Sequence, residues 1–381
     1  MVNYKKAQKL YKKSVEVLKS VQLKNGGILA TPKGERYPYV YPRDHAIGLL
    51  GFLSAGFKKE VKKGIEFIFK AQGKSGAFPQ RVDCAGKDAS YKPIQIDGTG
   101  LNLYVFSRYV KKHQDAEFFN RYSEQAKKAV AYILKNIEPD KDLVYTPNSI
   151  HEFPPIEQGL EIWANAVCCA ALREMDCFLD SERIKRGILK FMWNSRIQGF
   201  IKTIRLKESS SVVTAADASV LGLAEFGVID DRDEFFLKSV KRIEKNLWHS
   251  KLGGLCRYEK YYERNNGGYG PWPHFTLMLA RHYIRVKNKK NVDRCLNWVL
   301  NTAYRNLLPE HIAPVEEFEE YVQDFKEAGI LRKDRLTMIE NARKHPMFKK
   351  GLAYITLPLT WPHAEFIITW NLYQKTFNVR H

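Results

Sequence analysis

Residues 46–56 read AIGLLGFLSAG and residues 162–172 read IWANAVCCAAL. Both stretches have the length and composition of helices, and both are apolar on nearly every side. The helix that follows the first of them is different: Val61, Ile65 and Ile68 share one stripe and lysines occupy the opposite face. A helix without a polar face must be covered on all sides, whereas an amphipathic helix needs cover on one. The sequence therefore predicts two populations of helices, inner and outer.

The same alternation continues along the chain. Apolar periodicity bounded by Gly, Pro, Asn or Asp predicts about twelve helices. They begin near Tyr4, Arg43, Lys58, Gly98, Asp115, Gln158, Ser181, Ala215, Arg232, Pro271, Asn291 and Trp361. The even-numbered helices are the apolar ones, which predicts an inner ring of six wrapped by six outer helices. We therefore expect an all-α (α/α)6 toroid of six helical hairpins, built as one domain over residues 1–381. No fixed sequence repeat supports the alternative, an open solenoid. Residues 312–358 fit neither ring and are expected to form an excursion over the mouth.

Composition excludes several classes of protein. Hydrophobic residues make up 44% and charged residues 27% of the chain, as in ordinary globular proteins. No apolar run approaches the roughly 20 residues of a membrane span. The net charge of +20 comes from lysines spread along most of the chain, without a nucleic-acid-binding motif. We expect no nucleic-acid or membrane partner, and without a signal peptide the expected location is cytoplasmic.

Cofactor and metal motifs are missing from the sequence. The six cysteines form no C-x-x-C, and the chain has no P-loop, dinucleotide fingerprint or histidine pair at metal-ligand spacing. We expect reduced cysteines, no metal site and no cofactor. The acidic run at 230–233 opens an amphipathic helix and is interpreted as helix capping.

Polar and aromatic motifs precede nearly every apolar helix. They are YPYVYPRDH (37–45), IQIDGTG (94–100), SIHEFPPIEQGLEIW (149–163), TAADAS (214–219), RYEKYYERNNGGYGPWP (257–273) and PLTWPHAEF (358–366), joined by LLPEHI (307–312). Parallel inner helices would gather them at one end of the ring. Aromatic faces stack on sugar rings and charged planar groups bind hydroxyls, so the motifs predict a carbohydrate site.

Two glutamates in these motifs suit glycosidic bond cleavage. Glu152 lies in the third hairpin and Glu310 in the sixth, which places them on opposite sides of the predicted mouth. One protonated and one ionised carboxyl group, roughly 6.5–9.5 Å apart, constitute an inverting glycosidase apparatus.

Taken together, the motifs resemble glycoside hydrolase family 15, the glucoamylase-like exo-acting glucosidases, and they follow the family order through nearly the whole chain. The resemblance implies that Glu152 is the general acid and Glu310 the general base, without a cofactor. It further implies a set of residues that bind the substrate sugar: Arg43, Asp44, Asp97, Arg257, Trp272, Trp361 and, at the rim, His363.

Departures from the family pattern leave alternatives open. The acid motif reads His151-Glu152-Phe153 where the family has Trp-Glu, so Glu157 or Glu161 is an alternative acid. Tyr41 replaces a tryptophan beside the sugar pocket. The expected substrates are oligosaccharides or small soluble α-glucosides. The alternatives are a trehalase-like or anionic-sugar-specific glycosidase on the same fold, and an inactive sugar-binding or sensing protein.

Overall fold

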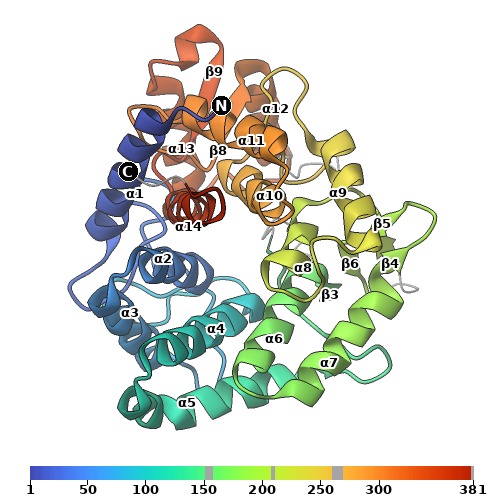
Figure 1. The fold of residues 1–381 in the computed structure, drawn as a ribbon. Coiled ribbons are helices and arrows are strands. Elements are labelled where there is room, and N and C mark those ends of the chain that lie inside the picture. The colour runs from blue at the N-terminus through green and yellow to red at the C-terminus, as the bar shows by residue number, and fades with distance from the viewer. Residues whose placement is uncertain (151–157, 207–210, 260–268, 379–381) are drawn as a thin grey trace.

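Six helices pack side by side in a closed ring in the computed structural model, which describes residues 1–150, 158–206, 211–259 and 269–378 (Figure 1). In ring order they are α2 (Pro42–Ala55), α4 (Ile96–His113), α6 (Ile162–Glu174), α8 (Gly222–Glu225), α10 (Pro273–Arg285) and α14 (Thr360–Thr376). The outer helices are α1 (Tyr4–Val21), α3 (Lys58–Lys70), α5 (Ala116–Lys135), α7 (Phe178–Gly187), α9 (Glu234–Leu247) and α11 (Lys289–Thr302). The predicted (α/α)6 toroid is confirmed.

Burial follows the apolar patterns that predicted the ring. In α6 every residue from Ile162 to Leu172 is buried, whereas α1 buries one stripe that includes Ala7, Leu10 and Leu18. The one strongly polar side chain inside α6 is Asn165, whose amide both donates to and accepts from the backbone of Val144. A buried amide with these partners avoids the cost of unmet hydrogen bonds.

The eighth helix is shorter than the sequence predicts. The segment expected to be helical from Ala215 instead forms a 3₁₀ turn, η2 (Ala218–Leu221), followed by the single turn of α8. Asp217 caps the turn by accepting from Ser219 N. Gly222 lets the ring of Trp163 approach closely, since a Cβ there would lie 2.9 Å from Trp163 Cε3. The helix ends just before Gly227, whose φ of +64° is the left-handed conformation that commonly closes a helix.

Short antiparallel strands lie in the segments that connect the helices. They are β1 (Ile137–Glu138) with β2 (Leu143–Val144), β4 (Trp193–Asn194) with β5 (Gly199–Phe200), and a three-stranded set of β3 (Leu160–Glu161), β6 (Thr203–Ile204) and β7 (Val212–Val213). A π-turn, η1 (Ile188–Met192), extends α7. Asp233 caps α9 by accepting from Phe235 N and Phe236 N, which confirms the capping interpretation of the acidic run.

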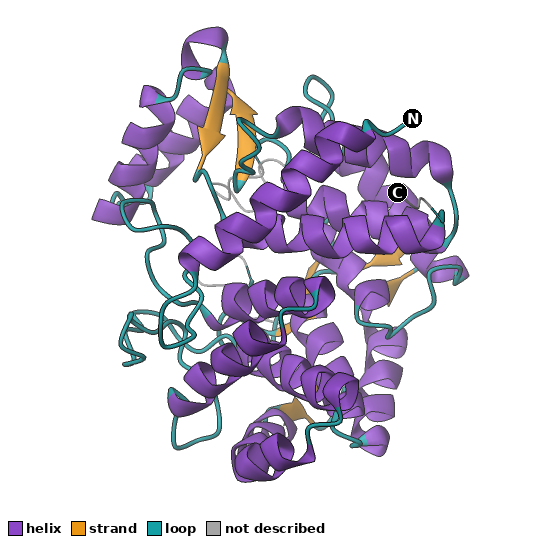
Figure 2. Cartoon of the chain, turned by 60° about the vertical axis from the view of Figure 1, so that its left-hand side comes forward, coloured by secondary structure: helices purple, strands orange, loops and turns teal. Residues whose placement is uncertain are grey.

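Residues 311–355, here called the cover segment, stand beside the ring (Figure 2). A hairpin of β8 (His311–Pro314) and β9 (Leu352–Ile355) brackets α12 (Val315–Glu327), α13 (Lys333–Lys344) and the short η3 (Phe348–Lys350). The segment has its own core, which includes Phe318, Phe325 and Met338 and is separate from the core of the ring. This explains why its pattern fits neither ring.

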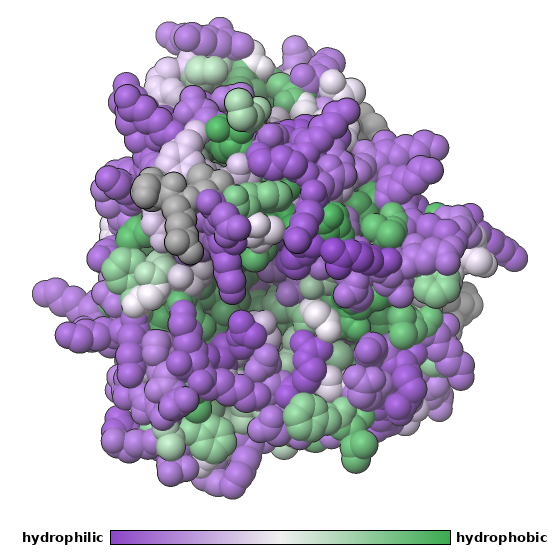
Figure 3. All heavy atoms as spheres, viewed as in Figure 1, coloured by the Kyte–Doolittle hydropathy of each residue, from purple (hydrophilic) through white to green (hydrophobic). Residues whose placement is uncertain are grey.

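The exposed face seen in Figure 3 is largely hydrophilic, as expected for outer helices that carry the lysines. Among the described residues, no helix is both long and apolar enough to cross a membrane. All six cysteines are free, and four of them are buried.

Candidate active site

A pocket opens where the N-termini of α2, α10 and α14 meet the cover segment. Five of the residues that the resemblance implies for the sugar line it directly, together with Glu310. The described lining residues are Ala30, Arg36, Tyr37, Tyr41, Arg43, Asp44, Tyr91, Lys92, Ile150, Arg257, Tyr258, Trp272, His274, Glu310, Tyr321, Asp334, Arg335, Leu359 and Trp361. Because the inner helices run parallel, motifs far apart in the sequence converge here.

Glu310 is a firmly held carboxylate of this pocket. Its backbone N donates to Ile355 O and Thr356 O, both at 3.0 Å, so the residue is fixed to the end of β9. Its side chain accepts from Thr356 Oγ1 at 2.8 Å and from Tyr37 OH at 3.4 Å, and Arg36 Nη1 lies 3.4 Å away. Only 7% of the residue is exposed. The carboxylate is thus oriented by two hydroxyls and one cation.

The charge states of the neighbours support that arrangement. Burial raises the pKa of the Tyr37 phenol well above its usual value, so Tyr37 keeps its proton and remains a donor. Burial alone would lower the pKa of Arg36, but the oxygens of Tyr37, Tyr321 and Glu310 more than offset it and the pKa is raised. Arg36 therefore stays cationic beside Glu310.

A second buried ion pair fixes Arg43 at the start of α2. Its Nε and Nη2 donate to the two oxygens of Asp97 at 2.6 and 3.2 Å, a bidentate geometry. Asp97 also accepts from Trp163 Nε1 at 2.9 Å. Asp97 does not line the pocket; it reaches the pocket only through Arg43. It is therefore placed as a residue that orients Arg43.

Aromatic rings form the opposite wall. The rings of Trp361 and His274 stack with centroids 4.5 Å apart, and those of Trp272 and His311 stack at 4.4 Å. The guanidinium of Arg257 lies 5.1 Å from the Trp272 ring centroid and donates to Ile150 O at 2.6 Å. These flat faces and the guanidinium are the groups that sugar rings and hydroxyls require.

His274, which lines the pocket, and His311, which stacks on Trp272 outside the lining, are both neutral. Burial, and next the charge of Arg257, lower the pKa of His274 well below its usual value, and burial with Arg36 and Arg257 does the same for His311. Among the described residues, neither nitrogen of His274 nor Trp272 Nε1 has a hydrogen-bond partner. A neutral imidazole can both donate to and accept from a hydroxyl.

His363 was predicted at the rim, and that placement is wrong. The residue is fully buried beneath the pocket, where its Nε2 accepts from Leu308 N at 3.0 Å and its Nδ1 pairs with Ser14 Oγ at 2.9 Å. Burial lowers its pKa to about 3. Its place in the first turn of α14 turns it toward α1, away from the mouth. By holding Leu308 it supports the loop that carries Glu310.

The structure describes one of the three candidates for the general acid. Glu152 and Glu157 lie outside the described residues. Glu161 is described: it is 1% exposed, ends β3 just before α6, and accepts from Ile150 N at 3.3 Å. It is absent from the pocket lining.

Several lining residues were missed by the sequence reasoning. Arg36, His274, Tyr321 and Arg335 reach the pocket, and only His274 follows a quoted motif directly. The sequence holds no local signal for Tyr321 and Arg335, because they belong to the cover segment and are brought in by its packing. Within the described ranges, no group of three or more His, Cys, Asp or Glu side chains could hold a metal ion.

Comparisons with known proteins agree with the fold. No protein-family model matches the chain. The chain is 35% identical to trehalase 1 of Sulfolobus acidocaldarius over 136 residues. The matched stretch covers 34% of this chain and 22% of that protein, so the chain matches about a fifth of the length of this curated relative.

Solved structures match over nearly the whole chain. A glycosidase variant in complex with glucose superposes with a TM-score of 0.74 at 17% identity, covering 98% of this chain and 99% of the other. A glucoamylase from Saccharomycopsis fibuligera superposes with a TM-score of 0.67 at 15% identity, covering 98% and 96%. The chain therefore has the (α/α)6 toroid fold that these glycosidases share.

Proposed function

We propose that the protein is a glycoside hydrolase that cleaves short α-glucosides from their non-reducing end, with inversion of the anomeric configuration. One observation carries the proposal: the buried Glu310 is fixed by hydroxyl donors in a pocket walled by stacked aromatic rings and arginines. A general base must be an ionised group held within hydrogen-bond reach of its water.

Glu310 has the environment of such a base. Thr356 and Tyr37 donate to its oxygens, and Arg36 stabilises its negative charge. A water on the pocket side would lose its proton to this carboxylate as it attacks the anomeric carbon. The opposite face of the sugar is then left for the acid, which protonates the leaving oxygen.

We assign the acid role to Glu152. Ile150 lines the pocket and accepts from Arg257, and Glu152 follows it by two positions in the sequence. Glu157 remains the alternative in the same stretch. The described position of Glu161, away from the pocket lining and bonded to Ile150 N, favours a structural role for that residue.

The sugar would bind against the inner-helix N-termini. Arg43, Asp44 and Arg257 would hold hydroxyls, while Trp272 and Trp361 would supply apolar faces. The pocket volume of about 110 Å³ is below the roughly 300 Å³ at which sites for drug-sized ligands begin, which favours short substrates.

Trehalose is a second candidate substrate. The sequence match to trehalase 1 of Sulfolobus acidocaldarius, at 35% identity over 136 residues, supports testing it beside the other disaccharides. Trehalose hydrolysis would need the same two carboxyl groups.

The test is hydrolysis of maltose, isomaltose, trehalose and 4-nitrophenyl α-glucoside, with the released anomer followed by NMR. We expect β-glucose from the cleaved bond with the wild type, and a loss of kcat of at least about 100-fold in Glu310→Gln. Glu316→Gln, which neutralises an exposed carboxylate on α12, is the matched control and should retain activity. Initial release of α-glucose alone from 4-nitrophenyl α-glucoside would contradict inversion. Sugar binding without cleavage of any substrate would favour the sensing alternative.

A further inference from the structure

The pocket lining carries more positive than negative charge. Among its described members are five cations (Arg36, Arg43, Lys92, Arg257 and Arg335) and three carboxylates (Asp44, Asp334 and Glu310). A neutral glucoside requires no surplus of this kind. The lining therefore holds more cations than carboxylates that could pair with them.

Two of the arginines are already matched. Arg43 forms the bidentate pair with Asp97, and Arg36 lies beside Glu310. Arg257 has no carboxylate partner in the described part of the chain, but it stacks on Trp272 and is placed with the sugar. Its guanidinium is therefore already assigned to binding the sugar hydroxyls.

Arg335 is the exception. The residue is 7% exposed. Its Nη1 donates to the backbone oxygen of Ile330 at 2.7 Å, and this is the acceptor that the described residues supply. Its guanidinium carbon lies 4.9 Å from the ring centroid of Phe325, and its buried Nε has no partner among the described residues. Burying a cation without a counter-charge is costly, so such a group marks a place where a ligand supplies the charge.

The position of Arg335 in its helix also favours an anionic ligand. It lies in the first turn of α13, where the positive end of the helix dipole disfavours a cation and favours an anion. The N-cap residue Arg332 makes no side-chain capping bond, so the N-terminal amides of the helix receive no side-chain acceptor there. A helix N-terminus and a buried arginine thus face the pocket together.

From this juxtaposition we propose that Arg335 and the N-terminus of α13 bind an acidic group of the substrate, a carboxylate or a phosphate attached to the sugar or to its leaving group. The inference rests on the proposed glycosidase function and names the substrate class. Arg335 is a specificity-determining residue; it has no part in bond cleavage. Asp334, which also lines the pocket, would oppose the bound anion.

The experiment compares three substrates that differ in charge: 4-nitrophenyl α-glucoside (neutral), 4-carboxyphenyl α-glucoside (acidic leaving group) and 4-nitrophenyl α-glucuronide (acidic sugar). We expect kcat/KM for one of the acidic substrates to fall at least about tenfold in Arg335→Met, since a charge-assisted bond is lost. The neutral substrate should change less than about twofold, because uniform structural damage is not expected. Arg335→Lys should restore part of the loss.

Two further variants make the readout specific. Lys333→Met removes an exposed positive charge from the same helix turn and should leave all three substrates unchanged. Asp334→Asn removes the opposing carboxylate and should improve the acidic substrate. Thermal melting of each variant shows whether it folds.

The outcomes separate the two proposals. Equal losses for neutral and acidic substrates in Arg335→Met, or no change for any of them, would overturn the role of Arg335 and leave the glycosidase proposal standing. If no glycoside is cleaved, the proposed function fails. Calorimetric titration of glucuronate, glucose 6-phosphate and glucose then tests Arg335 alone. Equal affinity for all three would overturn it, and weaker binding of an acidic sugar in Arg335→Met would support it.

Discussion

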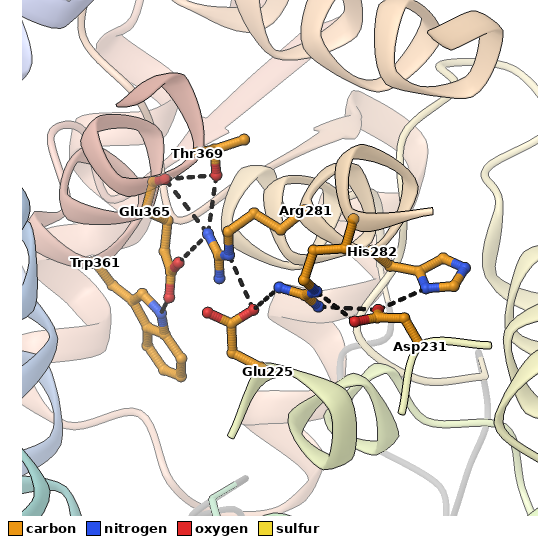
Figure 4. Close-up of polar contacts among 8 residues, drawn as sticks. Glu225, Asp231, Arg281, His282, Trp361, Glu365 and Thr369 are labelled. Carbon is orange, nitrogen blue, oxygen red and sulfur yellow. Dashed lines mark hydrogen bonds and ion pairs between the residues drawn. The ribbon is translucent and has the colours of Figure 1, made fainter. Parts of the chain in front are cut away.

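Arg281 occupies the centre of a buried ion network between α8, α10 and α14, and its replacement by methionine gives a quantitative test (Figure 4). The residue is 2% exposed. Its Nη1 lies 2.6 Å from Glu365 Oε2, and its Nε donates to Glu225 Oε2 at 2.9 Å. Glu365 in turn accepts from the indole of Trp361, at 2.8 Å. The network therefore connects the pocket wall to the interior of the ring.

The expected loss of stability follows from this burial. Methionine keeps the apolar stem but leaves the buried carboxylate of Glu365 without its cation, which costs about 3–5 kcal/mol. The partly buried Glu225 keeps Arg285, whose Nη1 lies 3.3 Å from its Oε2. For a chain of 381 residues the entropy of unfolding is about 0.8 kcal/mol per kelvin, so a loss of about 4 kcal/mol lowers Tm by about 5 °C.

The loss should depend on pH in a defined direction. Burial raises the pKa of Glu365 above its usual 4.5 although Arg281 opposes the rise, so removing Arg281 raises this pKa further. A carboxyl group whose pKa is higher in the folded state favours folding fully below the unfolded pKa, and that contribution is lost as pH rises through the folded pKa. The Tm deficit of the variant should be smallest near pH 4.5 and larger at pH 8.

Calorimetry of wild type and Arg281→Met between pH 4.5 and 8 is the measurement. Arg294→Met is the control, since Arg294 pairs with Glu244 but is 40% exposed and should cost about 1 kcal/mol or less. A Tm deficit in Arg281→Met no larger than in Arg294→Met, or one independent of pH, would refute the reasoning.

Three more predictions concern single contacts. Thr356→Val removes a donor from Glu310 and should lower kcat about five- to tenfold with little change in KM, as steady-state kinetics on a cleaved glycoside would show. Gly270→Ala should lower Tm by several degrees in a thermal melt, because φ is +74° there and a Cβ would lie 1.8 Å from Ile312 O; a shift under about 1 °C would contradict this. His363 has a pKa of about 3 when folded against 6.5 unfolded, so its contribution is full above pH 6.5 and is lost as pH falls toward 3. In His363→Asn the free energy of unfolding should therefore fall less steeply with decreasing pH than in the wild type, by up to about 1.4 kcal/mol per pH unit. Denaturant titration between pH 6.5 and 3 measures this slope.

The sequence predicted the ring because burial on all sides leaves a simple pattern. The runs at 46–56 and 162–172 could not face water, and both are inner helices, α2 and α6. The eighth helix did not follow its pattern. Its apolar run is compatible with a full helix, but the chain leaves the helix at Gly227, where φ is +64°, after the single turn in which Gly222 lies against the ring of Trp163. That contact joins residues that the sequence separates by 59 positions.

The candidate site was predicted in part. Arg43, Asp44, Arg257, Trp272, Trp361 and Glu310 converge because each begins or precedes an inner helix or the cover segment, and parallel inner helices bring these positions to one end. His363 shares the same motif as Trp361 but lies beneath the pocket. The two residues lie two positions apart, which on a helix is about 200° of rotation, so their side chains point in nearly opposite directions.

The sequence by itself determined the ring of inner and outer helices and the end of the ring where the polar motifs meet, since both depend on periodic burial along single helices. Only the tertiary structure decided which side chains enter the pocket. Arg36 reaches Glu310 across 274 positions, and Arg335 arrives on a helix of the cover segment that has its own core. Contacts of this kind depend on how separate elements pack, and packing distances and directions leave no local pattern in the chain.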